Sequence, residues 1–122
     1  MKPQHYHQLD HPSATVTIRL GGEVLARSNR TIQLKEVGRR IYDPVFYFPP
    51  EDVVQECLNP TTTRTMCPIK GEASYWAYTG PGGTREDLVW GYGDPIEYSE
   101  SIRGYLAFDS RVVTVEIDPG IA

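Results

Sequence analysis

A chain of 122 residues with 39% hydrophobic and 23% charged residues fits one globular domain rather than a disordered segment. Its net charge of −4 argues against a nucleic-acid-binding protein, which normally carries a basic face. The chain has no apolar run near the roughly 20 residues that cross a bilayer, and its first residues lack the apolar stretch of a signal peptide. We therefore expect a cytoplasmic protein without a membrane or nucleic-acid partner.

Short strands are expected along the first half of the chain, because 11 glycines and 10 prolines leave little room for long helices. Residues 1–13 show no periodicity and are predicted to form a flexible N-terminal arm. The Gly21-Gly22 pair predicts a hairpin turn. Alternating or β-prone composition predicts strands over residues 15–20, 24–26, 31–35 and 44–48.

One short helix is predicted over residues 50–58. Pro50 suits a first helical turn, and the two acidic residues after it complement the positive end of a helix. Asn59 precedes a proline and therefore ends the segment. Cys57 would then lie on the apolar face of this helix and pack as a small hydrophobic residue.

The second half of the chain predicts two further pairs of strands. The first is a hairpin around a glycine-rich loop at residues 80–83, and the second is a closing pair joined by a turn at residues 109–111. All elements together predict one all-β domain of short antiparallel strands over residues 14–118, followed by a C-terminal tail at residues 119–122. The strands of this half are expected over residues 73–78, 88–92, 104–108 and 112–117.

The most informative stretch is residues 65–75, where a thiol and an amine stand beside two backbone breakers. Pro68 and Gly71 predict a bend that brings Cys67 and Lys70 to one side, whereas positions three apart in a plain strand face opposite ways. A nearby ammonium favours the reactive thiolate, so Lys70 and Cys67 are the candidate catalytic residues. The alternative is a packed or pocket-lining thiol, because all three histidines of the chain lie in the expected N-terminal arm.

The amine of Lys70 is also expected to reach into a cleft and to hold an anion. Arg64 and Thr65 precede it, and these side chains together suit a phosphate or carboxylate through charge-assisted hydrogen bonds. The alternative is a surface lysine beside a threonine-rich loop that satisfies its own backbone. The chain lacks a Cys-x-x-Cys pair and a Walker motif, and neither a metal nor a cofactor is predicted.

Aromatic side chains form a second group of candidates. Trp90 and Tyr92 share one face of their strand, and Tyr47 points opposite to its two phenylalanine neighbours. Aromatic residues with a polar tip commonly line small-molecule sites, so these three and Tyr75 are expected to form the walls of a pocket. Packing within the core is the alternative, since aromatic residues are favoured in strands.

Four motifs follow one another along the chain. They are Phe46-Tyr47-Phe48-Pro49 with Asp52, Cys67-Pro68-Ile69-Lys70-Gly71 with Tyr75, Trp90-Gly91-Tyr92-Gly93-Asp94-Pro95, and Ile102-Arg103-Gly104 with Phe108. In this order they resemble the domain of unknown function 427 family over residues 14–118. The resemblance implies a compact β-tent-like or barrel-like fold whose biochemical role is mostly unassigned, although some classifications label the family nucleotidyltransferase-like. The chain departs from the family at Ile69, where an aromatic residue often stands.

Two functions of different classes follow from these observations. The first is a domain that binds a small anionic ligand or metabolite around Lys70 and the turn at residues 67–71, with enzymatic activity left open. The second is a non-catalytic protein-interaction module, or a homodimer, that uses the aromatic strands. A deep pocket around the amine favours the first function, and a flat exposed apolar patch favours the second.

Overall fold

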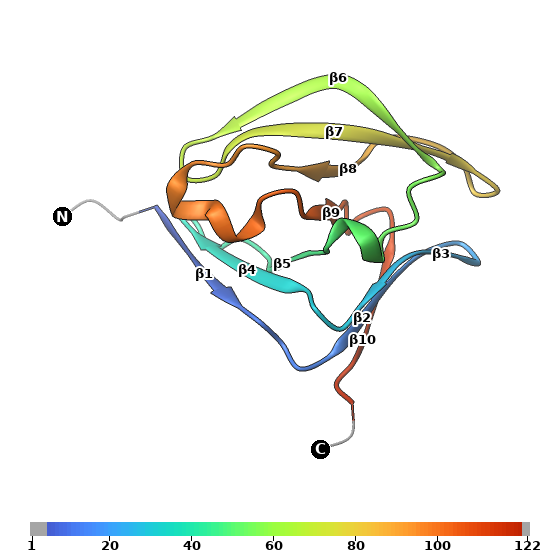
Figure 1. The fold of residues 1–122 in the computed structure, drawn as a ribbon, viewed down its shortest axis with the longest axis horizontal. Coiled ribbons are helices and arrows are strands. Elements are labelled where there is room, and N and C mark those ends of the chain that lie inside the picture. The colour runs from blue at the N-terminus through green and yellow to red at the C-terminus, as the bar shows by residue number, and fades with distance from the viewer. Residues whose placement is uncertain (1–4, 121–122) are drawn as a thin grey trace.

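Three antiparallel sheets make up the fold of residues 5–120, the part of the chain that the computed structural model describes. The strand orders are β1-β4-β5, β10-β2-β3 and β6-β7-β8-β9, and β6 to β8 run across the top in Figure 1. The mainly-β prediction is confirmed, and within these residues the sheets do not close into a barrel. The strands are β1 (Tyr6–Asp10), β2 (Thr15–Leu20), β3 (Glu23–Ser28), β4 (Ile32–Val37), β5 (Val45–Tyr47), β6 (Leu58–Cys67), β7 (Gly71–Gly80), β8 (Gly83–Gly91), β9 (Leu106–Phe108) and β10 (Thr114–Asp118).

The helical elements of the described residues are two 3-10 helices, η1 (Pro50–Asp52) and η2 (Glu97–Ile102). No helix in that part of the chain combines the length and the apolar character of a membrane span. The helix predicted over residues 50–58 is wrong beyond its first turn. Val53 and Val54 are β-branched and favour extended backbone, and both join β3 instead, Val53 through a β-bridge and Val54 through an amide hydrogen bond of 2.8 Å.

The N-terminal arm predicted from the sequence is a strand over residues 6–10. β1 pairs antiparallel with β4 over its whole length, so backbone hydrogen bonds hold a segment that has no hydrophobic periodicity. His7 in β1 is buried, and its Nε2 lies 2.7 Å from the Ser99 hydroxyl. That hydroxyl donates to the Ile69 carbonyl at 2.6 Å, so the histidine nitrogen is the donor of the first hydrogen bond. Residues 1–4 of the predicted arm lie outside the described part.

The threonine-rich stretch before Cys67 belongs to β6 and is not a loop. Thr61 and Thr63 each donate to the Asp87 carboxylate of β8 at 2.7 Å, and these hydrogen bonds hold the threonines in the sheet. Cys57, which the sequence places on a helix, lies just before β6 and packs partly buried against the core. Residues 61–63 form an irregularity within β6, between Pro60 and Arg64, which both pair with β7.

The last two strands do not pair with each other as the sequence suggests. β9 pairs with β8, and β10 crosses to the other side of the molecule and pairs with β2. The intervening residues 109–111 still turn, because the Asp109 carboxylate accepts a hydrogen bond from the Arg111 amide at 3.0 Å. The C-terminal strand therefore completes a different sheet from the one that β9 completes.

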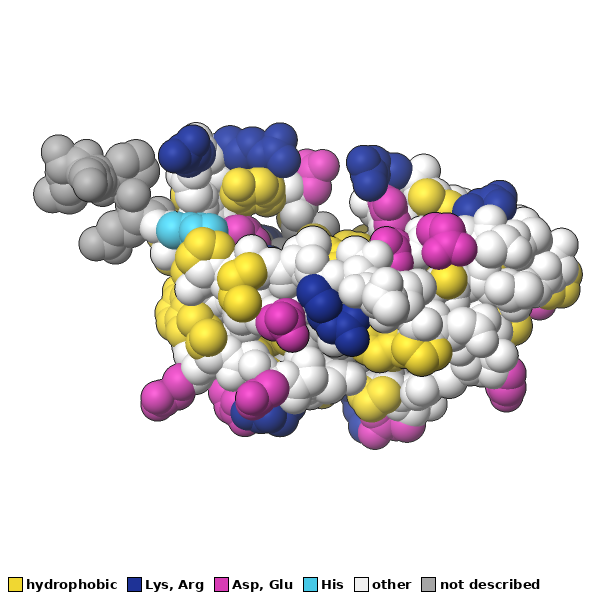
Figure 2. All heavy atoms as spheres, turned by 90° about the horizontal axis from the view of Figure 1, so that it is seen from above, with side chains coloured by type: hydrophobic (Ala, Val, Ile, Leu, Met, Phe, Trp, Pro, Cys, Tyr) yellow, Lys and Arg dark blue, Asp and Glu magenta, His cyan; other side chains and the backbone are white. Residues whose placement is uncertain are grey.

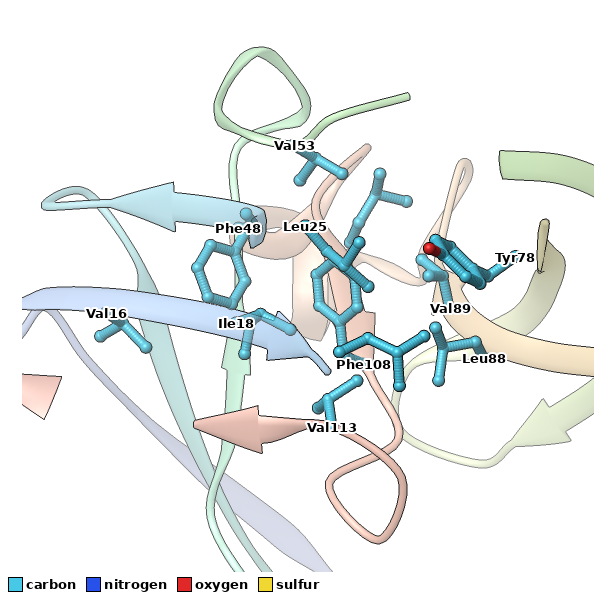
Figure 3. Packing of buried hydrophobic residues seen from close by; sticks show 13 residues of the cluster. Val16, Ile18, Leu25, Phe48, Val53, Tyr78, Leu88, Val89, Phe108 and Val113 are labelled. Carbon is cyan, nitrogen blue, oxygen red and sulfur yellow. The ribbon is translucent and has the colours of Figure 1, made fainter. Parts of the chain in front are cut away.

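Two hydrophobic clusters fill the space between the sheets. The larger one includes Ile18, Phe48 and Phe108, and Figure 3 shows its side chains converging from several strands. The Phe48 and Phe108 rings meet edge to face with centroids 5.6 Å apart. The smaller cluster includes Leu34 and Tyr47. Tyr47 and Phe48 are consecutive and point opposite ways, so the end of β5 contributes one fully buried ring to each cluster.

The bend predicted around Pro68 is a hairpin loop between β6 and β7. Cys67 pairs with Gly71, and the Lys70 amide donates to the Cys67 carbonyl at 3.3 Å. Gly71 has φ +106°, a conformation that other residues rarely adopt, and a Cβ at this position would lie 3.4 Å from the backbone nitrogen of Ile96. The Ile96 amide in turn donates to the Lys70 carbonyl at 3.1 Å, which fixes the loop against the chain that leads into η2.

Replacing Gly71 by alanine is expected to destabilise the fold by about 1–3 kcal/mol, because a side chain is strained at this backbone angle. Urea unfolding followed by circular dichroism measures the change. The matched control is Gly22→Ala, where no atom of residues 5–120 beyond the two chain neighbours lies within 4 Å of the added methyl group and no left-handed φ is present. Equal unfolding free energies for the two variants would show that the turn does not need glycine.

Candidate functional site

The side chain of Lys70 turns inward from the hairpin loop. It is 11% exposed, and its ammonium nitrogen donates to a Glu36 carboxylate oxygen at 2.7 Å. The same nitrogen lies 5.7 Å from the centroid of the Tyr92 ring, within cation–π range. Lys70 is therefore a buried cation rather than a surface lysine.

Glu36 reaches this amine from the opposite sheet. Ile32, Leu34 and Glu36 share one face of β4, and the two apolar residues belong to the smaller cluster, so the carboxylate points between the sheets. Its second oxygen accepts a hydrogen bond from the His5 Nε2 at 2.6 Å. The series His5–Glu36–Lys70 thus links the start of the described chain, β4 and the β6–β7 hairpin.

The molecular surface is hollowed on one face. Figure 2 shows a hollow with a histidine and an acidic side chain at its edge, beneath a projecting segment that carries Lys and Arg side chains. His5 is exposed, whereas the side chain of Glu36 is only 13% exposed. The contact between His5 and Glu36 therefore joins a more exposed imidazole to a buried carboxylate.

Three further predicted site residues lie on the inner face of the four-stranded sheet. Cys67 and Thr65 are two positions apart in β6 and face the same way, and the Thr65 hydroxyl lies 2.9 Å from the Tyr75 hydroxyl. Cys67 and Tyr75 are half-buried members of the cluster that contains Tyr47 and Tyr92. This face carries one thiol and two hydroxyl groups, and Thr65 is exposed to solvent.

Arg64 does not join the amine of Lys70. It precedes Thr65 by one position and so points to the outer face of the sheet, where it is exposed. Its guanidinium donates to the carbonyls of Thr61 and Thr63 at 3.0 and 2.7 Å. The anion clamp of Arg64 with Lys70 that the sequence predicts is therefore not assembled, because strand alternation separates the two cations.

The aromatic residues differ in what they can contact. Tyr47 and Tyr92 are 0% and 5% exposed, so both pack in the core around the amine rather than line an open wall. Trp90 is half-buried, and its indole N–H donates to the Tyr47 hydroxyl at 3.3 Å. Tyr75 and Trp90 are cross-strand partners in β7 and β8, and these two rings remain available as walls.

Electrostatics of the cluster follow from burial and pairing. Burial alone raises the pKa of Glu36, but the hydrogen bonds from Lys70 and His5 outweigh it and hold that pKa below its ordinary value of 4.5. Burial alone lowers the pKa of Lys70, but Tyr47 in its ionised form, at high pH, and the hydrogen bond and charge of Glu36 outweigh burial and raise that pKa above 10.5. Burial also raises the pKa of the Tyr47 and Tyr92 phenols. At neutral pH the site therefore holds one ammonium, one carboxylate and two neutral phenols.

Two members of the site, Glu36 and His5, are absent from the candidates that the sequence suggested. Glu36 continues the period-two series of Ile32 and Leu34, so its place on a buried face was available as a signal. His5 lies in a segment without periodicity, and no sequence signal indicates that it reaches Glu36. Among residues 5–120, no group of three or more His, Cys, Asp or Glu side chains is arranged to hold a metal ion.

Residues 8–119 match the sequence profile of a family described as a domain of unknown function, DUF427, and the chain belongs to this family. The resemblance of the four motifs is thereby confirmed. No significant match to a curated protein accompanies it. The family description assigns no activity, so the function is argued from the site.

Separating the Lys70–Glu36 pair is expected to be costly, because either single change leaves a buried charge without its partner. Lys70→Met and Glu36→Gln should each lower the free energy of unfolding by about 3 kcal/mol, and the double variant should lose less than the sum. Urea unfolding of all four proteins gives the coupling energy. The control cycle uses Lys35 and Asp10, whose side chains are 49% and 35% exposed and should couple by less than about 1 kcal/mol. Equal coupling in both cycles would contradict the buried pair.

Stability is expected to fall in two steps on acidification. Burial lowers the pKa of His7 below 6.5, so the unfolded chain takes up this proton first and unfolding becomes more favourable as the pH falls below 6.5. The depressed pKa of Glu36 adds a second loss below pH 4.5. The free energy of unfolding should be measured from pH 8 to 3.5. The loss below pH 6.5 should be absent in His7→Gln, and the loss below pH 4.5 should be absent in Glu36→Gln. A wild-type profile that is flat from pH 7.5 to 5 would contradict the assignment of His7.

Proposed function

We propose that this chain is a cytoplasmic binding domain for a small anionic molecule whose charged group is held by the Lys70 amine. The proposal rests on the number of hydrogen-bond donors that this amine has in excess of its partners. An ammonium has three N–H donors, and within residues 5–120 its hydrogen-bond partner is a single Glu36 oxygen. Buried donors are normally satisfied, so the remaining donors suit the oxygens of a carboxylate or phosphate.

The surroundings of the amine support an anion that binds beside Glu36. His5 already binds the second oxygen of that carboxylate, so Glu36 has another partner when Lys70 also binds an anion. The hydroxyl groups of Thr65 and Tyr75, which lie 2.9 Å apart at an exposed position, are the further donors that we propose for this ligand. Cys67 and Trp90 are the remaining half-buried members of the predicted site and supply a thiol and a ring as walls.

A thermal-shift screen of phosphate, small carboxylates and nucleotides tests the proposal. A ligand at one hundred times its Kd stabilises a protein by about 2.7 kcal/mol, which a melting curve resolves. Lys70→Met should weaken the best ligand at least tenfold, whereas Lys35→Met, at an exposed lysine, should leave its Kd unchanged. Glu36→Gln should bind as tightly as the wild type or more tightly, because the negative charge of the neighbouring carboxylate is gone.

Retention of full affinity by a folded Lys70→Met protein would refute the anion site. Circular dichroism of each variant at the assay temperature confirms that it is folded. Glu36→Gln serves as a second check, because it disturbs the same ion pair without removing the amine. A loss of binding in both variants would indicate damage to the fold rather than loss of a ligand contact.

A second function, association with a protein partner or another copy of the chain, is favoured by exposed apolar side chains. Ile41 and Met66 are 82% and 71% exposed. Sedimentation across a hundredfold range of concentration distinguishes the two functions. A dimer that dissociates in Met66→Ser or Ile41→Ser would support the second function, and a monomer at all concentrations would speak against self-association.

A further inference from the structure

A separate apolar hollow lies between β5 and the two sheets on either side of it. Its volume is about 200 Å³, and Lys70 is not among the residues that line it. Ile18 and Val115 come from the paired strands β2 and β10, and Trp90 and Phe108 come from β8 and β9. Within the described part of the chain, the lining is Ile18, Pro44, Val45, Phe46, Trp90, Phe108, Ser110 and Val115.

The residues that line the hollow are mainly apolar. Val45, Phe46, Trp90 and Val115 are all only partly buried, so their side chains keep apolar area in contact with water. Placing an apolar molecule against such area is favourable in proportion to the area covered. Among residues 5–120, no Lys, Arg, Asp or Glu lines the hollow, and Ser110 contributes a side-chain hydroxyl. A charged ligand would therefore lose its hydration without gaining a partner.

The indole of Trp90 forms a boundary between this hollow and the Lys70 site. Its ring lines the hollow, while its N–H group donates to the Tyr47 hydroxyl in the neighbouring cluster. The polar edge of the indole is thus already engaged, and its apolar surface faces the hollow. A flat ring between Trp90 and the phenylalanines would make the offset or edge-on contacts that aromatic pairs prefer.

We propose that this hollow is a second binding site, for a neutral molecule with a single aromatic ring. The size decides the class: an apolar cavity of about 150 Å³ holds benzene, whereas drug-sized ligands occupy about 300–1,000 Å³. A volume of about 200 Å³ admits one ring with a small substituent, and the Ser110 hydroxyl at the rim suits a hydroxyl or carbonyl on that substituent. This site does not depend on the function proposed for Lys70.

The indole N–H signal of Trp90 in a proton–nitrogen correlation spectrum reports occupation of the hollow. The chain has two tryptophans, and Trp76→Phe assigns the signal. Titration with toluene and with phenol should shift the Trp90 signal along a saturating curve, and benzoate should bind at least tenfold more weakly. A Trp90 signal that does not move up to the solubility limit of toluene would overturn the proposal, as would equal binding of benzoate.

Substitutions that fill the hollow with a larger side chain test whether the ligand binds there. Val115→Phe should weaken toluene binding at least tenfold, whereas Ile117→Phe, on the same strand but not in the lining, should leave it unchanged. Ser110→Phe blocks the exposed rim and should weaken binding even if Val115→Phe fails to fold. Toluene binding that persists in Ser110→Phe would overturn the site. Lys70→Met should retain toluene binding, so the failure of one site is distinguishable from the failure of the other.

Discussion

The ion pair between Lys70 and Glu36 is the contact on which the rest of the site depends. Its partners are 34 residues apart and come from β4 and from the hairpin loop between β6 and β7. Removing two charges from water is expensive, and only close pairing with further hydrogen bonds offsets this expense. The pair therefore sets how the β6–β7 hairpin and β4 stand relative to each other, and His5 extends this constraint to the segment that precedes β1.

A buried ion pair of this kind contributes little net stability, because well-packed apolar side chains in its place often stabilise the folded protein equally well. In this protein the importance of the pair is the binding chemistry that it makes available. It keeps a cation inside an aromatic cluster, and it leaves N–H donors that a ligand oxygen can satisfy. The neutral phenols of Tyr47 and Tyr92 surround the ammonium without competing for its charge at neutral pH. The same pair that constrains the sheets thus also prepares the amine for an anion.

The two hydrophobic clusters are separate but connected through single residues. The end of β5 gives Tyr47 to one cluster and Phe48 to the other, and Trp90 reaches from the apolar hollow to the Tyr47 hydroxyl. A change of packing at the hollow therefore has a direct contact with the ring beside Lys70. This arrangement follows from strand alternation, since neighbouring residues of a strand face opposite sides.

The sequence by itself determined part of the backbone conformation: the alternating strands, the hairpin around residues 80–83 and the bend that glycine at position 71 permits. These features depend on local sterics and on period-two hydrophobicity, and both can be recognised from the sequence alone. Only the tertiary structure decided the partners. It paired residues 6–10 with β4, drew Val53 and Val54 to β3, sent β10 to β2, and joined Lys70 to Glu36 rather than to Arg64. The reason is physical: hydrogen bonds and ion pairs between segments far apart in the chain depend on which faces are buried together, and no local pattern specifies that.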